Sequence, residues 1–148
     1  MSKPIVVPYA TTLLVRDTCL CLHLQQAARA VARYFDDALR PVGLTNGQFS
    51  LLMSLNRPEP APMRSVASLL AVDRTTLTAA LKPLERRGLL TVSADPADRR
   101  GRLLTLTPEG MAVLARAVPI WERSHAALDA KMAGTDPEAL RKTLRALA

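Results

Sequence analysis

The spacing of apolar side chains changes twice along the second half of the chain, and these two changes restrict the fold more than any other feature. Up to Gly88, apolar residues recur every three or four positions, as on a helix that faces a core. Between residues 103 and 107 they alternate with polar residues, which is typical of a half-buried strand. The helical spacing returns after Pro108. This order predicts a mainly α-helical protein with one small β-hairpin.

Prolines set the limits of the first helix. We expect an amphipathic helix that begins at Asp17 and ends before Pro41, because its apolar residues lie three or four positions apart. Residues 1–16 are expected to form an N-terminal arm. Its first dozen residues are predicted to be extended, since Pro4 and Pro8 interrupt them.

A short helix is expected to begin at Thr45, with a capping-box sequence. Two further helices follow it before the hairpin. Residues 57–62 contain three prolines and are expected to form an extended linker. A short helix is predicted over residues 63–70. Asp73 is a favourable N-cap for the next helix, which is expected to stop at Gly88.

The two predicted strands, 89–94 and 103–107, enclose a turn that is rich in arginine. Between residues 74 and 102 there are seven basic and three acidic side chains, in a chain of 148 residues with a net charge of +7. All but one of these basic residues are arginines, and the planar guanidinium group suits phosphates and guanine edges. The segment therefore indicates a nucleic-acid partner rather than only a solvated surface.

The long helix that follows Pro108 carries apolar residues at alternating steps of three and four. Such heptad spacing is typical of a helix that packs along another helix. We therefore expect a homodimer seam made by Leu114, Val118, Trp121, His125, Leu128 and Met132. Within this seam, His125 is interpreted as a packed interface histidine, with a pH- or ligand-responsive group as the alternative. A last helix begins near Thr135 and is expected to turn three leucines inward, namely Leu140, Leu144 and Leu147.

A helix–turn–helix followed by a hairpin is the order of a winged helix-turn-helix. Its second helix enters the major groove of DNA, which is about 12 Å wide, and the hairpin reaches the adjacent minor groove. The candidate DNA-binding residues are Arg74, Thr75, Thr76, Thr78 and Lys82 on the helix, and Arg99, Arg100 and Arg102 at the hairpin tip. Asp98 is expected to pair with Arg100 and to hold it in one orientation.

Four sequence motifs give the chain a resemblance to the MarR (multiple antibiotic resistance regulator) family of bacterial transcription factors. They are residues 44–49, 73–78, 98–100 and 106–110. The resemblance implies one MarR-like domain over residues 1–148, in which a winged helix-turn-helix lobe (45–107, with its wing at 89–107) is flanked by dimerisation helices (17–44 and 108–148). It also implies a homodimer that binds a pseudo-palindromic operator, and a small aromatic or phenolic effector. The leading hypothesis is a transcriptional repressor. One residue departs from the pattern of the family, since Pro83 stands where many relatives carry a basic or polar residue.

Cys19, Cys21 and His23 do not form a plausible metal site. On a helix Cys21 points about 200° away from Cys19, so the three side chains do not converge. Buried and inert thiols are therefore the simplest interpretation.

A redox function of Cys21 is kept as an alternative hypothesis. Cys21 lies 24 residues before Thr45, a spacing that resembles the reactive cysteine of the organic-hydroperoxide sensors in the same family. The resemblance places a tyrosine near that thiol, but Phe35 and Asn46 occupy the matching positions here. Both lack the hydroxyl that would stabilise a thiolate.

Other classes of protein receive little support from the sequence. No run of 18 apolar residues and no signal-peptide pattern are present, so we expect a cytoplasmic protein with no membrane partner. No nucleophile–base pair, phosphate-binding glycine loop or metal-ligand spacing is visible, which predicts no enzyme, no catalytic residues and no cofactor. A dimeric helical interaction module without DNA binding is the alternative from another class, and the arginine-rich tip argues against it.

Overall fold

The computed structural model describes residues 1–148, mainly as helices with one small sheet. The elements are α1 (Tyr9–Thr18), α2 (Leu20–Leu39), a 3-10 turn (Arg40–Val42), α3 (Asn46–Ser54), β1 (Ala61–Pro62), α4 (Met63–Leu70), α5 (Arg74–Arg86), β2 (Leu90–Asp95), β3 (Asp98–Leu106), α6 (Pro108–Lys131) and α7 (Pro137–Leu147). They pack as two units, Met1–Tyr34 and Phe35–Ala148, and the boundary falls inside α2. No helix combines the length and the apolar character that crossing a bilayer requires.

The first unit is more helical than the sequence indicated. Helix α1 begins directly after Pro8, so the extended conformation predicted for the first dozen residues is wrong from residue 9 onward. The reason is that a proline disfavours helical backbone at the residue before it, whereas the residues after it are free to be helical. No further proline occurs until Pro41. The extended backbone of Cys19 (ψ 110°) separates α1 from α2. The predicted helix from Asp17 is thus two helices.

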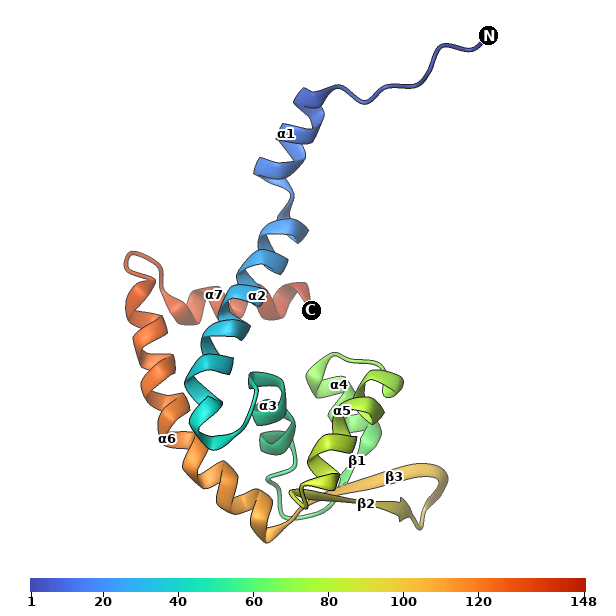
Figure 1. The fold of residues 1–148 in the computed structure, drawn as a ribbon, viewed down its shortest axis with the longest axis vertical. Coiled ribbons are helices and arrows are strands. Elements are labelled where there is room, and N and C mark those ends of the chain that lie inside the picture. Colours follow the sequence, from blue (N-terminus) through green and yellow to red (C-terminus); the bar gives the residue numbers. More distant parts are fainter. The chain divides into compact units, whose positions relative to one another are not determined.

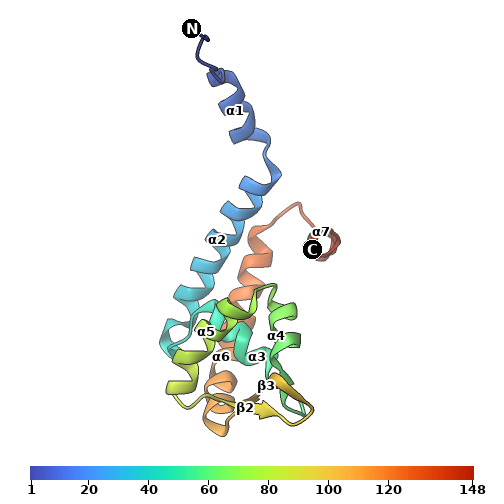
Figure 2. The same ribbon diagram turned by 90° about the vertical axis from the view of Figure 1, so that its right-hand side faces the viewer.

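In the second unit, α3, α4, α5 and the β2–β3 hairpin surround one apolar core (Figure 1). Helix α4 packs against α3, α5 and β3, while α5 packs against β2 (Figure 2). The largest fully buried side chains are Leu39, Leu52, Val66, Leu77, Leu84, Leu90 and Leu104. Leu77 and Leu84 lie seven residues apart on the inner side of α5. Their burial fixes which side of α5 remains exposed.

Local capping signals place the helices of this unit as the sequence predicted. The Thr45 hydroxyl accepts a hydrogen bond from the backbone N–H of Gln48, and the Gln48 side chain accepts one from the backbone N–H of Thr45. This reciprocal capping box fixes the start of α3. Thr107 caps α6 and Pro108 is its first residue. Helix α4 spans residues 63–70 as predicted.

The sheet has three strands, in the order β1-β3-β2, rather than the two strands of a simple hairpin. The end of the proline-rich linker forms β1, where Ala61 pairs with Leu104 and Pro62 pairs with Leu103. Ala61 has no exposed surface. The strand escaped prediction because its two residues pair only with a distant part of the chain.

The β2–β3 hairpin, called the wing below, is also longer than predicted. Strand β3 begins at Asp98 instead of residue 103, so only Pro96 and Ala97 separate the two strands. The arginines that were expected in a turn, Arg99, Arg100 and Arg102, are therefore residues of β3.

Helix α6 uses the first part of its heptad pattern within its own chain. Leu114 is only 2% exposed and belongs to the core, so its assignment to a seam between two chains is wrong. Val118 and Trp121 also pack against this core. The side chain of Trp121 stacks on Phe49, with ring centroids 6.1 Å apart. Heptad spacing marks an apolar face, and here α3 already covers the beginning of that face.

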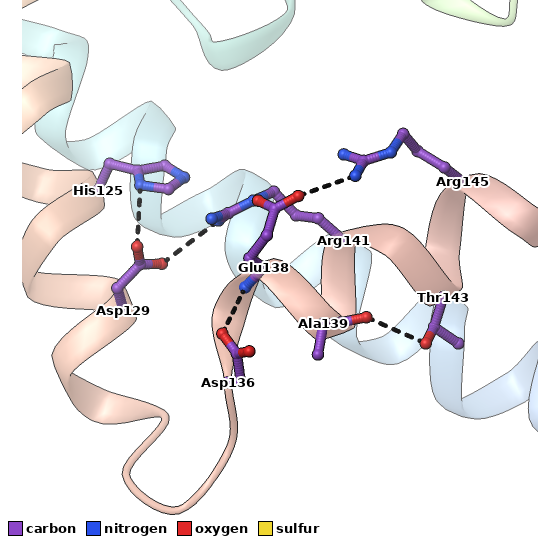
Figure 3. Close-up of polar contacts among 8 residues, drawn as sticks. All are labelled: His125, Asp129, Asp136, Glu138, Ala139, Arg141, Thr143 and Arg145. Atoms are coloured by element: carbon purple, nitrogen blue, oxygen red, sulfur yellow. Dashed lines mark hydrogen bonds and ion pairs between the residues drawn. The ribbon is translucent and has the colours of Figure 1, made fainter.

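Beyond Trp121, α6 carries a polar cluster that joins it to α7 (Figure 3). The His125 ring lies 4.7 Å from that of Trp121, and its Nδ1 atom lies 3.6 Å from Oδ2 of Asp129. The other carboxylate oxygen of Asp129 is 3.9 Å from the guanidinium group of Arg141 on α7. Arg141 also forms an ion pair with Glu138 at 3.0 Å. Of these ion pairs, the one between Asp129 and Arg141 links the two helices.

Helix α7 has no buried residue, which corrects the expectation that its leucines turn inward. Leu140, Leu144 and Leu147 are 37%, 40% and 59% exposed. These three leucines form an apolar face that stays partly exposed. Leu128 and Met132 on α6 are half-buried, and their role in a dimer seam stays a prediction.

Candidate nucleic-acid interface

The start of α5 is fixed by its N-cap. One carboxylate oxygen of Asp73 accepts a hydrogen bond from the backbone N–H of Thr76 at 2.7 Å. This bond, followed by further bonds from Thr76 and Thr75, holds the pKa of Asp73 below its ordinary value. A charged cap at this end also complements the helix dipole. The first turn of α5 is therefore a rigid platform for the side chains that it presents.

The exposed side of α5 carries the residues that the sequence predicted. Arg74, Thr75, Thr76, Thr78 and Lys82 are all exposed, and four of them, together with Ala79, line a hollow of about 370 Å³. The Thr78 hydroxyl donates a hydrogen bond to the carbonyl of Arg74 at 2.8 Å. Its oxygen remains available only as an acceptor. The Thr76 hydroxyl is likewise engaged, because it donates to the carboxylate of Asp73. Thr75 is therefore better placed than Thr76 or Thr78 to donate to a base edge.

Pro83 lies inside α5 without ending the helix, which continues to Arg86. Because proline has no N–H, it cannot donate to the carbonyl of Ala79, four residues earlier. Pro83 thus offers no basic or polar side chain at this turn but leaves the helix intact.

The wing presents its arginines from an irregular part of β3. All three side chains, Arg99, Arg100 and Arg102, are exposed. Asp98 does not pair with the guanidinium group of Arg100, which corrects the prediction. It instead accepts a hydrogen bond from the backbone N–H of Arg100 at 3.0 Å, because a side chain this short reaches its own turn more easily than the end of an arginine. Asp98 therefore shapes the backbone of the wing.

A second hollow, of about 420 Å³, lies between α4, the start of α5 and the wing. Its lining includes Arg64, Arg74 and Arg102 together with the carboxylates of Asp95 and Asp98. Arg64 is a basic residue of this surface that the sequence reasoning missed. Its position in the first turn of α4, which braces α5 and directly follows the linker, was the available signal.

Three hydrogen bonds connect the segments around the base of the wing. The Thr107 hydroxyl donates to the carbonyl of Gly88 at 2.6 Å and accepts from the backbone N–H of Gly110 at 3.0 Å. The guanidinium group of Arg87 donates to the carbonyl of Gly43 at 2.8 Å. Arg87 belongs to the basic segment in sequence but acts as a structural link between α5 and the turn before α3.

The thiols differ from the expectation that they are buried. Cys21 is exposed and Cys19 is partly exposed. The Cys21 sulfur accepts a hydrogen bond from the side-chain amide of Gln25 at 3.2 Å. Phe35 is buried, and Asn46 donates both its backbone N–H and its side-chain amide to Asp36, at 2.7 and 2.8 Å. Neither residue supplies the hydroxyl that the redox hypothesis needs, and that hypothesis is not favoured.

Together, a capped and exposed helix, a bracing helix and an arginine-bearing hairpin define a winged helix-turn-helix protein. Residues 44–101 match the family model described as "MarR family". The organic hydroperoxide resistance transcriptional regulator of Bacillus subtilis is 30% identical over 101 residues, which cover 68% of this chain and 69% of that protein. The chain belongs to the MarR family of transcriptional regulators.

Solved structures agree with this assignment. The transcriptional regulator MosR of M. tuberculosis in complex with DNA has 38% sequence identity and a TM-score of 0.78, over 86% of this chain and 92% of that chain. The regulator BpsR of Bordetella bronchiseptica, whose DNA binding is regulated by 6-hydroxynicotinic acid, has 30% identity and a TM-score of 0.73. That match covers 86% of this chain and 91% of BpsR.

Proposed function

We propose that the protein is a homodimeric repressor that binds a pseudo-palindromic DNA operator in the cytoplasm and is controlled by a small molecule. The observation that carries this proposal is the joint exposure of the start of α5 and the arginines of β3 on one lobe. The solved MosR–DNA complex, at 38% identity, supports DNA as the partner.

The two parts of the lobe read DNA differently. Thr75 and Thr76 at the start of α5 enter the major groove and contact base edges, while Lys82 contacts phosphate. Arg100 on the wing enters the minor groove, whose negative potential is strongest where the groove is narrow. Arg99 and Arg102 neutralise phosphates beside it. Base contacts supply the sequence preference, and the wing supplies affinity and sensitivity to groove width.

Dimerisation places two such lobes on successive major grooves. The exposed leucines of α7, Leu140, Leu144 and Leu147, provide an apolar face of the kind that a second chain covers. A twofold axis then requires two half-sites about 10 bp apart, or a multiple of that distance, in inverted orientation.

A small aromatic or phenolic acid is the proposed effector. BpsR, a relative of similar length, responds to 6-hydroxynicotinic acid, and this supports the same class of ligand here. The test is fluorescence anisotropy of the protein–operator complex during titration with hydroxybenzoates and hydroxynicotinates. Release of the operator by one of these compounds is expected. If none of them changes operator affinity, this class of effector is rejected.

Selection of binding sites from random duplex DNA tests the proposal as a whole. The purified protein is expected to enrich an inverted repeat, and Thr76→Ala is expected to change which bases are tolerated, since each lost base contact costs about 1–3 kcal/mol. Arg100→Ala is expected to weaken binding to all sequences. It is also expected to reduce by about one the slope of the logarithm of the binding constant against the logarithm of the salt concentration, called the salt slope below. Enrichment of no sequence by the wild-type protein would overturn the proposed function.

A further inference from the structure

The wing contains three residues that have no partner across the hairpin. Ala94 pairs with Arg102 and Asp95 pairs with Asp98, so the ladder passes over residues 99–101. Backbone groups that leave a ladder need other hydrogen-bond partners or water. The conformation of this bulge is therefore set by side chains and not by the sheet.

Two side chains supply bonds to the central residue of the bulge. The backbone N–H of Arg100 donates to Oδ1 of Asp98 at 3.0 Å, within the same strand. The carbonyl of Arg100 accepts from the Nη2 atom of Arg74 at 2.7 Å, and Arg74 belongs to α5. One of the two bonds that hold Arg100 thus comes from α5, which is the recognition helix of the proposed DNA complex.

Arg74 is well placed to act as a rigid brace. It is the first residue of α5 and directly follows the N-cap Asp73, so its backbone cannot move independently of the helix. Its side chain lines both the hollow along α5 and the hollow beside the wing, which places it between the two. A guanidinium group is planar and permanently charged, and its hydrogen bond to a carbonyl is stronger than a neutral one.

We propose that Arg74 is a positioning residue that holds the wing at a fixed place relative to the recognition helix. The minor-groove arginine, Arg100, is then already in position when the helix enters the major groove, and DNA binding does not have to order the wing. This inference rests on the proposed function, and it changes the role predicted for Arg74 from reading DNA to positioning the residue that reads it.

The first test uses the protein without DNA. Backbone amide order parameters are measured by NMR relaxation for the wild type, for Arg74→Met and for the matched control Lys82→Met, which removes a charge from the same helix. In Arg74→Met the values at Arg100 and Gly101 are expected to fall from the rigid range, about 0.85, to below about 0.6. They are expected to stay unchanged in Lys82→Met. Unchanged values in Arg74→Met would overturn the proposal, whether or not the protein binds DNA.

The second test is a double-mutant cycle on the selected operator. If Arg74 acts by placing the Arg100 side chain, the double variant Arg74→Met/Arg100→Ala is expected to bind within about twofold of the weaker single variant. Adding Arg74→Met to Arg100→Ala is also expected to leave the salt slope unchanged, whereas Lys82→Met lowers it by about one. Two results would instead show a direct phosphate contact by Arg74. The first is that the affinity losses of the two single variants multiply in the double variant. The second is that Arg74→Met lowers the salt slope by one both in the wild type and in Arg100→Ala.

Discussion

At the scale of single residues, two carboxylates organise the lobe by accepting backbone hydrogen bonds. Asp73 caps α5, and Asp36 at the end of α2 accepts from the backbone and side chain of Asn46, at the start of α3. The pKa of Asp36 lies below its ordinary value, chiefly because of the backbone bond and then because of the side-chain bond from Asn46. Both groups are therefore charged in the folded protein near neutral pH.

Asp73→Ala removes the cap and leaves an N–H at the start of the recognition helix without its partner. We expect the free energy of unfolding to fall by about 1 kcal/mol, the typical loss for an N-cap. Asp73→Asn keeps an accepting oxygen and is the matched control, with a smaller loss. Urea denaturation followed by circular dichroism measures both. Equal stability of Asp73→Ala and the wild type would contradict the capping role.

The lowered pKa of Asp36 predicts how the free energy of unfolding depends on pH. Its pKa is lower in the folded than in the unfolded chain, so its contribution is fully present above the unfolded value, about 3.9, and is lost as the pH falls through the folded value. The stability advantage of the wild type over Asp36→Asn is expected to be constant above about pH 5 and to shrink below about pH 4. Urea denaturation across this range measures it. A stability difference between the wild type and Asp36→Asn that stays constant over the whole pH range would show that the charge of Asp36 does not contribute to stability.

At the scale of elements, the join between the wing and α6 allows no extra atom. A Cβ at Gly110 would lie 2.0 Å from the carbonyl oxygen of Leu89, and a backbone atom cannot move aside cheaply. Gly110→Ala is expected to lower the free energy of unfolding by about 3 kcal/mol or more. The matched control is Gly47→Ala in α3, where the nearest atom is 4.0 Å away. That variant is expected to be neutral or slightly stabilising. A neutral Gly110→Ala in thermal denaturation would contradict this packing.

The elements also show which parts of the structure can be predicted from sequence. Helices α3, α4 and α5 were predicted well because Thr45, Asp73 and the prolines act on neighbouring residues. Three features depend on residues far away in the sequence, so no local pattern predicts them. They are strand β1, the bulge at residues 99–101 and the hydrogen bond from Arg74 to Arg100. The heptad pattern of α6 correctly marked an apolar face. It could not show that Leu114 is covered by the chain itself.

At the scale of the whole molecule, the proposed mode of DNA binding requires two chains. The three exposed leucines of α7 are costly to leave in water, and a partner that covers them gains about 25 cal/mol for each Å² of apolar surface removed from water. The ion pair between Asp129 and Arg141 links α6 to α7, and Glu138 pairs with Arg141 within α7. We expect the link between the two helices to set the direction in which that apolar face is presented to the partner.

Leu144→Asp is expected to give a monomer, because it places a charge in the apolar face of α7. Thr143→Asp, one residue earlier, introduces the same charge at an exposed polar position and is the matched control, which should remain a dimer. Light scattering at micromolar concentration measures both masses. A persistent Leu144→Asp dimer would show that α7 does not contribute to the interface.

In the proposed complex two lobes read one duplex, each with a helix in the major groove and a wing in the minor groove. Hydroxyl-radical footprinting on the selected operator tests it most directly. We expect two protected regions related by a twofold axis and about 10 bp apart, or a multiple of that distance. Each should have minor-groove protection beside it that disappears in Arg100→Ala. A single protected region, or minor-groove protection that persists in Arg100→Ala, would contradict it.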